Sequence, residues 1–278
     1  MTLVSYDFMR HALLAAVLVG VAALTVGVYL VQRRLSLIGD GIGHVALAGV
    51  AAGLLTSAAP VLTALAAAVA GAAAIELIRA RGRTSGDLAL AILFYGGIAG
   101  GVVIISQAPG GTPGNLNAYL FGAITTTSRA DLLVFAVLSL AVLAVTLGLG
   151  RYLFAVSNDE DYAAAAGIPV LRLNLLLAVV TAVTVVISMR VIGLLLISAL
   201  MIVPVASAQL IAHSFRATIV VAVLIGLAVS VAGVSTSYYA DTPSGGTIVL
   251  FAIAVFIATT AARAVRASRA SRASRAGR

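Results

Sequence analysis

Asp40 and His44 are the pair of side chains whose types and spacing best suit chemistry. They lie four residues apart in the apolar, glycine-rich run 39–50, GDGIGHVALAGV. On a helix this spacing places the carboxylate and the imidazole on one face, one turn apart. An oxygen and a nitrogen ligand placed in this way suit a borderline divalent metal such as Zn²⁺ or Mn²⁺. Two ligands do not complete a coordination shell, so water, backbone carbonyls or other side chains would have to supply the rest.

Ionisable residues in apolar segments also have structural roles that compete with metal binding. The pair could be a buried hydrogen-bonded couple, or Asp40 could neutralise Arg33 or Arg34 a few residues earlier. The spacing alone leaves metal binding and these two roles open. For Glu76 a structural role is favoured, because Arg79 follows three residues later and the two predict an ion pair on one helix face.

Membrane-spanning helices must position these residues. The chain has 278 residues, of which 62% are hydrophobic and only 9% are charged. A soluble domain has about 45–50% apolar and about 25% charged residues, so this chain lacks the polar surface that water requires. The apolar runs predict an all-α polytopic membrane protein with nine spans, or eight, at 8–31, 37–56, 61–78, 88–106, 132–149, 173–189, 191–212, 217–237 and 247–262. The sixth of these spans, 173–189, is short for a crossing and could be a partial or tilted segment.

The positions of the arginines predict the orientation of the chain. All 17 basic residues are arginine; counted on alternate sides of nine spans, 14 fall on one side and the other 3 are Arg10, Arg129 and Arg190. The positive-inside rule then places the N-terminus outside and the C-terminus in the cytoplasm. The net charge of +8 therefore indicates topology and does not indicate nucleic-acid binding. We expect one transmembrane domain over 1–263 and a basic, disordered tail over 264–278, whose Arg-Ala-Ser repeats could lie against anionic membrane lipid.

The residue types that are absent exclude several classes of site. Without cysteine the chain has no disulfide, thiolate zinc site or Fe–S cluster. Without lysine it cannot carry a phosphate-binding loop of the GxxxxGK type, so another chain must hydrolyse any ATP that is used. An intramembrane metalloenzyme is disfavoured, because the three histidines stand at 11, 44 and 213 and none belongs to an HExxH pair.

One sizeable polar stretch, 156–169, lies between predicted spans on the cytoplasmic side. Ser157 or Asn158 can serve as the N-cap of a short helix, and three acidic residues follow in its first turn, where they complement the helix dipole. Gly167 and Pro169 then end the helix. Such an amphipathic helix at the membrane surface is either a docking element for a cytoplasmic partner or an ordinary capped loop helix.

Six motifs occur in an order that resembles the permease subunits of bacterial zinc/manganese uptake ABC transporters, the ABC-3 family. The run Gly39-Asp40-x-x-x-His44 resembles their second-helix motif, and Tyr-Leu-Phe-Gly at 119–122 resembles a signature of the family. The sequence departs from the family at Gly43, where many relatives carry serine, and at Ala48, where many carry proline, which removes an expected helix irregularity. The other matches are the cytoplasmic helix at 159–169 and the stretches 85–94, 191–208 and 237–245.

The resemblance implies a multi-pass permease of the bacterial cytoplasmic membrane that imports divalent metal ions, zinc first and manganese or iron next. It implies no cofactor and no enzymatic activity in this chain. Asp40 and His44 fall on the family's metal-path positions. The implied partners are a second permease copy, an extracytoplasmic metal-binding protein, and ATP-hydrolysing subunits that dock on Asp159, Glu160, Asp161, Tyr162, Ala166 and Gly167.

Two other functions stay open from the sequence. An ion-coupled secondary transporter or channel for divalent cations would work without the docking helix. A permease for siderophore or cobalamin-type ligands tends to be longer and to lack the Asp-x-x-x-His pair.

Overall fold

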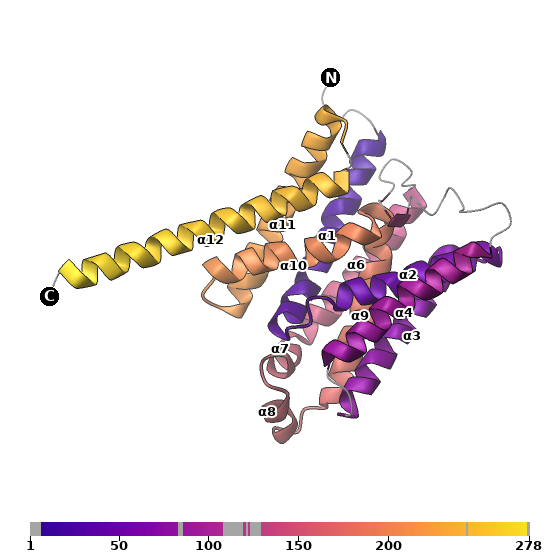
Figure 1. Ribbon diagram of the computed structural model, residues 1–278, viewed down its shortest axis with the longest axis horizontal. Helices are drawn as coiled ribbons and strands as arrows, with labels where there is room; N and C mark the ends of the chain where they lie inside the picture. Colours follow the sequence, from indigo (N-terminus) through magenta and orange to yellow (C-terminus); the bar gives the residue numbers. More distant parts are fainter. Residues whose placement is uncertain are drawn as a thin grey trace.

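The computed structural model describes residues 7–82, 86–107, 119–120, 122, 129–242 and 244–276. The described residues form helices joined by short turns, without a strand, as the composition predicts (Figure 1). The motif positions 85, 121 and 243 and the last two tail residues lie outside this part of the chain. The helices are α1 (Asp7–Gln32), α2 (Ile38–Leu55), α3 (Pro60–Ala80), α4 (Gly86–Ser106), α6 (Arg129–Gly148), α7 (Gly150–Asn158), α8 (Glu160–Ala165), α9 (Val170–Val191), α10 (Leu194–Ile211), α11 (Phe215–Ala240) and α12 (Ser244–Ala276).

Eight helices of the described part are long and apolar enough to cross a membrane, namely α1, α2, α3, α4, α6, α9, α11 and α12. The ninth apolar helix, α10, has 18 residues, the same number as α2. The prediction that the sixth span is the short one is therefore wrong, because α9 has 22 residues. Arg172 and Arg190 interrupt the apolar pattern near the two ends of α9 but do not interrupt the helix.

Helix α12 continues to Ala276 and projects beyond the other helices (Figure 1). Its far part is the basic tail from 264 onward, for which the composition predicts disorder. Alanine and arginine are strong helix formers, and the tail extends a helix that the preceding span has already nucleated. Through Ala276 the tail is thus helical in the structure.

Helix α1 is packed against α6, α9, α10 and α11. Every residue from 22 to 30 is buried. The Tyr29 hydroxyl donates a hydrogen bond of 2.9 Å to the carbonyl oxygen of Thr146 in α6. This contact ties the last turns of α1 to the last turn of α6.

Helices α2, α3 and α4 lie side by side, and α2 also contacts α9 and α10 (Figure 1). Small residues permit this packing: a Cβ added at Gly49 would lie 2.7 Å from the carbonyl oxygen of Thr63 in α3. Helix α2 runs unbroken through Ala48, the position where the family often has proline. Four neighbouring helices therefore hold one continuous helix that carries the candidate metal pair.

The bundle has two ends that differ in their polar contacts. The short helices α7 and α8 follow α6 and precede α9, and they mark one end, the α8 end. At the opposite end Arg190 Nη1 donates to Asp131 Oδ1 over 2.5 Å and joins the last turn of α9 to the first turn of α6. Helix α10 starts just after α9, and Ala212 beyond its last turn lines a hollow with Gln32 of α1. Helix α10 thus runs from one end of the bundle to the other.

Candidate functional site

Helix α2 brings Asp40 and His44 onto one face. Asp40 lies in its first turn and His44 one turn later. Both side chains are half-buried, and they are close enough for the charge of Asp40 to act on the imidazole. The His44 ring packs edge-on against Phe94 of α4, with 4.7 Å between the ring centroids. This contact restricts the orientation of the imidazole.

The backbones of α4 and α2 approach each other closely at His44. A Cβ added at Gly97 of α4 would lie 2.7 Å from the backbone nitrogen of Val45 and 2.8 Å from the carbonyl carbon of His44. Gly97 is therefore required for the observed distance between these two helices. The position of the imidazole depends on this packing.

Helix α10 packs against the same segment of α2. A Cβ added at Gly43 would lie 2.5 Å from Leu194 Cδ1, so leucine occupies the space that a serine at this position would need. At Gly39 an added Cβ would lie 3.1 Å from the Ser198 hydroxyl oxygen. Ser198 is buried, and its hydroxyl has no hydrogen-bond partner in the described part of the chain. A free oxygen donor thus lies beside the residue that precedes Asp40.

The structural roles that compete with metal binding at Asp40 do not occur among the described residues. Arg33 binds Glu160 instead of Asp40. No hydrogen bond or ion pair in this part joins Asp40 to His44 or to Arg34. The carboxylate and the imidazole therefore keep ligand atoms available. The same residues hold no cluster of three or more His, Cys, Asp or Glu side chains, so the chain provides two side-chain ligands of these types at α2.

The stretch after α7 forms the predicted short helix, α8, with a different cap. Asp159, rather than Ser157 or Asn158, is the N-cap, and its carboxylate accepts a hydrogen bond of 2.9 Å from the backbone N–H of Tyr162. Asn158 is instead the last residue of α7. At the far end Gly167 has φ of 76°, a left-handed conformation that suits glycine and stops the helix as predicted.

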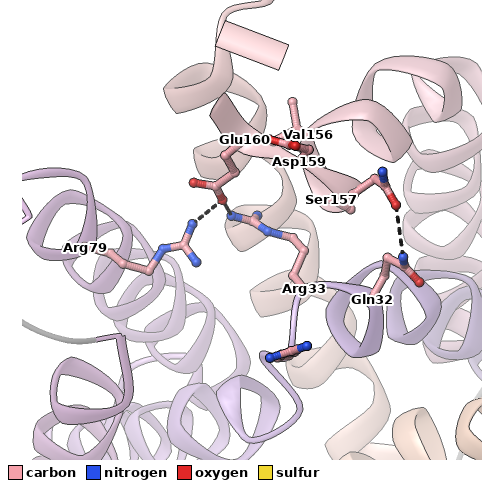
Figure 2. A pocket seen from close by; sticks show the side chains of 9 residues that line it. Gln32, Arg33, Arg79, Val156, Ser157, Asp159 and Glu160 are labelled. Atoms are coloured by element: carbon pink, nitrogen blue, oxygen red, sulfur yellow. Dashed lines mark hydrogen bonds and ion pairs between the residues drawn. The ribbon is translucent and has the colours of Figure 1, made fainter. Parts of the chain in front are cut away.

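The predicted docking residues lie on two different faces of α8. Asp161, Ala166 and Gly167 are exposed, and 69% of Tyr162 is exposed. Glu160 points the other way, toward Arg33 and Arg79, which reach its carboxylate from two sides, and 42% of its side chain stays exposed (Figure 2).

Charged residues from distant parts of the sequence surround Glu160. The predicted ion pair between Glu76 and Arg79 is confirmed, at 3.4 Å, and Arg79 also donates to Glu160 at 2.6 Å. Burial raises the pKa of Glu160, but Arg33 and Arg79 lower it by more, so this pKa lies below its ordinary value. The pKa of Arg33 is lowered by burial and by Arg79, and the two glutamates oppose this shift.

Sequence reasoning did not find this cluster. Its contacts join residues 127 and 81 positions apart, and no local spacing signals them. The cluster borders a hollow of about 440 Å³ at the α8 end of the bundle, which Gln32 and Ser157 also line. The α8 helix is thus tied to the membrane helices through charge and is not a free loop.

Comparison with known proteins places most of the chain in one family. The ABC 3 transport family profile matches residues 5–263. A protein of Halalkalibacterium halodurans named as the manganese transport system membrane protein MntC is 33% identical over 254 residues, which cover 91% of this chain and 87% of the relative. A protein of Haemophilus influenzae named for an iron transport system is 28% identical over 256 residues, which cover 92% and 94%.

A solved structure agrees with the sequence relatives. A chain of PsaBC from Streptococcus pneumoniae, determined in complex with Fab, superposes with a TM-score of 0.81 and 30% identity over 92% of this chain and 91% of that one. The agreement extends over nearly the full length, and the eight apolar helices make this a multi-pass protein of the bacterial cytoplasmic membrane. The chain belongs to the ABC 3 transport family and is a metal-transport permease.

Proposed function

We propose that this chain forms the path of an ATP-driven importer for a divalent first-row transition metal, and that Asp40 and His44 bind the ion in transit. The pair itself carries the proposal. A charged residue costs about 2.5–3.5 kcal/mol at the centre of a span on insertion scales, and an ionisable residue within a span is a functional-site hypothesis by default. Asp40 forms no ion pair with Arg33, Arg34 or His44, so its carboxylate is available to an ion in transit.

The names of the relatives support manganese as the transported metal. The names of the MntC relative and of the Haemophilus protein refer to manganese and to iron. The order expected from the motifs, zinc before manganese, has less support. Imidazole and carboxylate ligands suit Mn²⁺, Fe²⁺ and Zn²⁺ alike, so the pair does not select among them. We therefore place manganese first, iron next and zinc after them.

A second copy of the chain would complete the binding site. One copy offers a carboxylate and an imidazole at α2. Two copies facing each other across a shared path would offer four ligands, enough for a tetrahedral shell or for an octahedral one finished by water. A partial site of this kind also releases its ion, because tight binding in a path prevents transport.

The α8 end is the proposed docking end for the ATP-hydrolysing subunits, and it faces the cytoplasm. The arginine count places Arg33 and Arg79 on the cytoplasmic side, and both lie at this end. The exposed face of α8, with Asp161 and Tyr162, is available for contact with a partner. A metal-binding protein would then deliver the ion at the opposite end, and ATP binding would drive the closure that expels it inward.

Substitution of the pair tests the proposal. The permease is expressed with its ATPase and binding protein in cells that lack other metal importers, and cellular manganese, iron and zinc are measured by ICP-MS over time. Asp40→Ala and His44→Ala should each abolish accumulation while the complex still assembles. His213→Ala removes an exposed histidine and serves as the matched control, with uptake like that of the parent.

Two results would contradict the proposal. Uptake that survives both Asp40→Ala and His44→Ala would show that the pair does not bind the ion in transit. Uptake that persists when the partner ATPase carries an inactivating change in its phosphate-binding loop indicates an ion-coupled transporter or channel instead.

A further inference from the structure

One carboxylate oxygen holds three elements of the bundle together at the α8 end. Glu160 Oε1 accepts hydrogen bonds from Arg33 Nη2, from Arg79 Nη2 at 2.6 Å and from Asn174 Nδ2 at 3.3 Å. Arg33 follows α1, Arg79 belongs to the last turn of α3, and Asn174 belongs to α9. Figure 2 shows the two guanidinium groups converging on the carboxylate. A single side chain of α8 thus contacts three separate helical segments.

The burial of the arginines makes this contact costly to lose. Only 4% of the Arg33 side chain is exposed, and 20% of the Arg79 side chain. Glu76 and Glu160 together balance the two arginines. Without Glu160, the buried Glu76 alone would have to compensate both guanidinium groups. An uncompensated buried charge is strongly unfavourable, so the cluster favours the position of α8 in which Glu160 stays in place.

Apolar packing alone holds α8 weakly. The helix has six residues, and Ala163 is the one of them that is buried. An alanine buries little apolar surface, and a helix this short is not stable by itself. The position of α8 therefore depends on its covalent connections and on the polar contacts of Glu160.

The residues that hold Glu160 are directly connected to α2. The chain passes from Arg33 to the start of α2 at Ile38 through a turn with its own hydrogen bonds, from Leu35 N to Leu30 O at 2.9 Å and from Ile38 N to Leu35 O at 3.1 Å. Helix α3, which carries Arg79, packs along α2. A displacement of α8 would thus act on α2 at two places. Arg33 would transmit it to the first turn of α2, where Asp40 lies, and Arg79 would transmit it through α3 to the side of α2.

We propose that Glu160 is a positioning residue that fastens the docking helix to α1 and α3, so that movement imposed on α8 by the ATPase reaches the metal pair on α2. The inference rests on the proposed function. The two faces of α8 then have different roles. The exposed face contacts the ATPase, and Glu160 on the opposite face transmits the movement to α1 and α3.

The test measures how much metal is moved per ATP hydrolysed by the complete complex in proteoliposomes. Glu160→Gln keeps the shape of the side chain and removes its charge. We expect the ratio of transported Mn²⁺ to hydrolysed ATP to fall about tenfold, within the range that coupling free energies between sites produce. Arg79→Gln should lower the ratio in the same way. Arg81→Gln, which removes an exposed arginine two residues later, is the matched control and should leave the ratio unchanged.

A cross-link separates fastening from a general loss of structure. The chain has no cysteine, so Glu160→Cys with Arg79→Cys introduces the only two thiols of each permease chain. The double variant should have a low ratio, and joining the thiols with a short bismaleimide should restore it toward the parent value. If the Glu160→Gln complex does not assemble, this cross-linked pair decides the question.

Three results would overturn the inference: a parental ratio in Glu160→Gln, a ratio in Arg79→Gln no different from that of Arg81→Gln, or a cross-linked protein that transports no better than the unlinked one. These results are distinct from failure of the proposed function, in which the parent complex itself accumulates no metal.

Discussion

Substituting Gly97 tests whether the spacing between α2 and α4 sets the geometry of the metal pair. An alanine Cβ at this position would lie 2.7 Å from the backbone nitrogen of Val45, whereas ordinary contact begins near 3.4 Å. Because the two nearest opposing atoms belong to backbone, the two helices must separate, by about 0.7 Å if ordinary contact is to be restored. Overpacking of this kind costs about 1–3 kcal/mol.

Gly96→Ala is the matched control, because an added Cβ there meets nothing within 4 Å. Both substitutions gain about 0.8–1 kcal/mol of helix propensity, so the difference between the two variants isolates the clash. Gly97→Ala should melt at least about 2 °C below Gly96→Ala. Its manganese uptake should be at least about tenfold lower, since a misplacement of about 1 Å at a binding geometry can cost about 100-fold.

The assays are thermal unfolding in detergent and ICP-MS of cells that express each variant with the ATPase and binding protein. Equal melting temperatures and equal uptake in the two variants would refute the reasoning. A lower melting temperature with parental uptake would support the clash between α2 and α4 but would show that this spacing does not control metal transport.

Two further predictions concern stability. Tyr29→Phe removes the buried hydrogen bond to the Thr146 carbonyl oxygen and should cost about 0.5–1.5 kcal/mol in thermal unfolding, whereas Tyr95→Phe, at an exposed tyrosine, should be neutral. Equal effects of the two changes would contradict this. The pKa of Glu160 lies below its ordinary value of 4.5, so its contribution is fully present above pH 4.5 and is lost as the pH falls through the lower folded-state pKa. The stability advantage of the parent over Glu160→Gln should therefore be constant from neutral pH to about pH 5 and shrink only below 4.5; an advantage that already shrinks between pH 7 and pH 6 would exclude this titration.

The features that the sequence predicts well are local. Asp40 and His44 share one helix, so their spacing alone places them on one face, and Glu76 with Arg79 is a second case of the same kind. The helical class and most span positions follow from apolar runs longer than any soluble helix requires. The end of α8 was also predictable, because Gly167 suits a conformation that few other residues adopt.

The features that the sequence does not predict depend on contacts between distant segments. Glu160 looks like one of three equivalent acidic residues in a first turn, and only the fold reveals that it alone faces Arg33. The N-cap of α8 was misplaced by one residue because Asn158 and Asp159 are both good caps and α7 extends through the first of them. Helix α9 was judged too short because charged residues near its ends hide its length.

The surroundings of α10 affect how it sits in the bilayer. The eighteen residues of Leu194–Ile211 rise about 27 Å, close to the thickness of about 30 Å of the hydrocarbon layer. Helix α10 contacts α1, α2, α9, α11 and α12, so protein rather than lipid lies beside much of its surface. Hydrophobic mismatch, which tilts helices that face lipid, therefore has little influence on α10, and packing against its five neighbours sets its position.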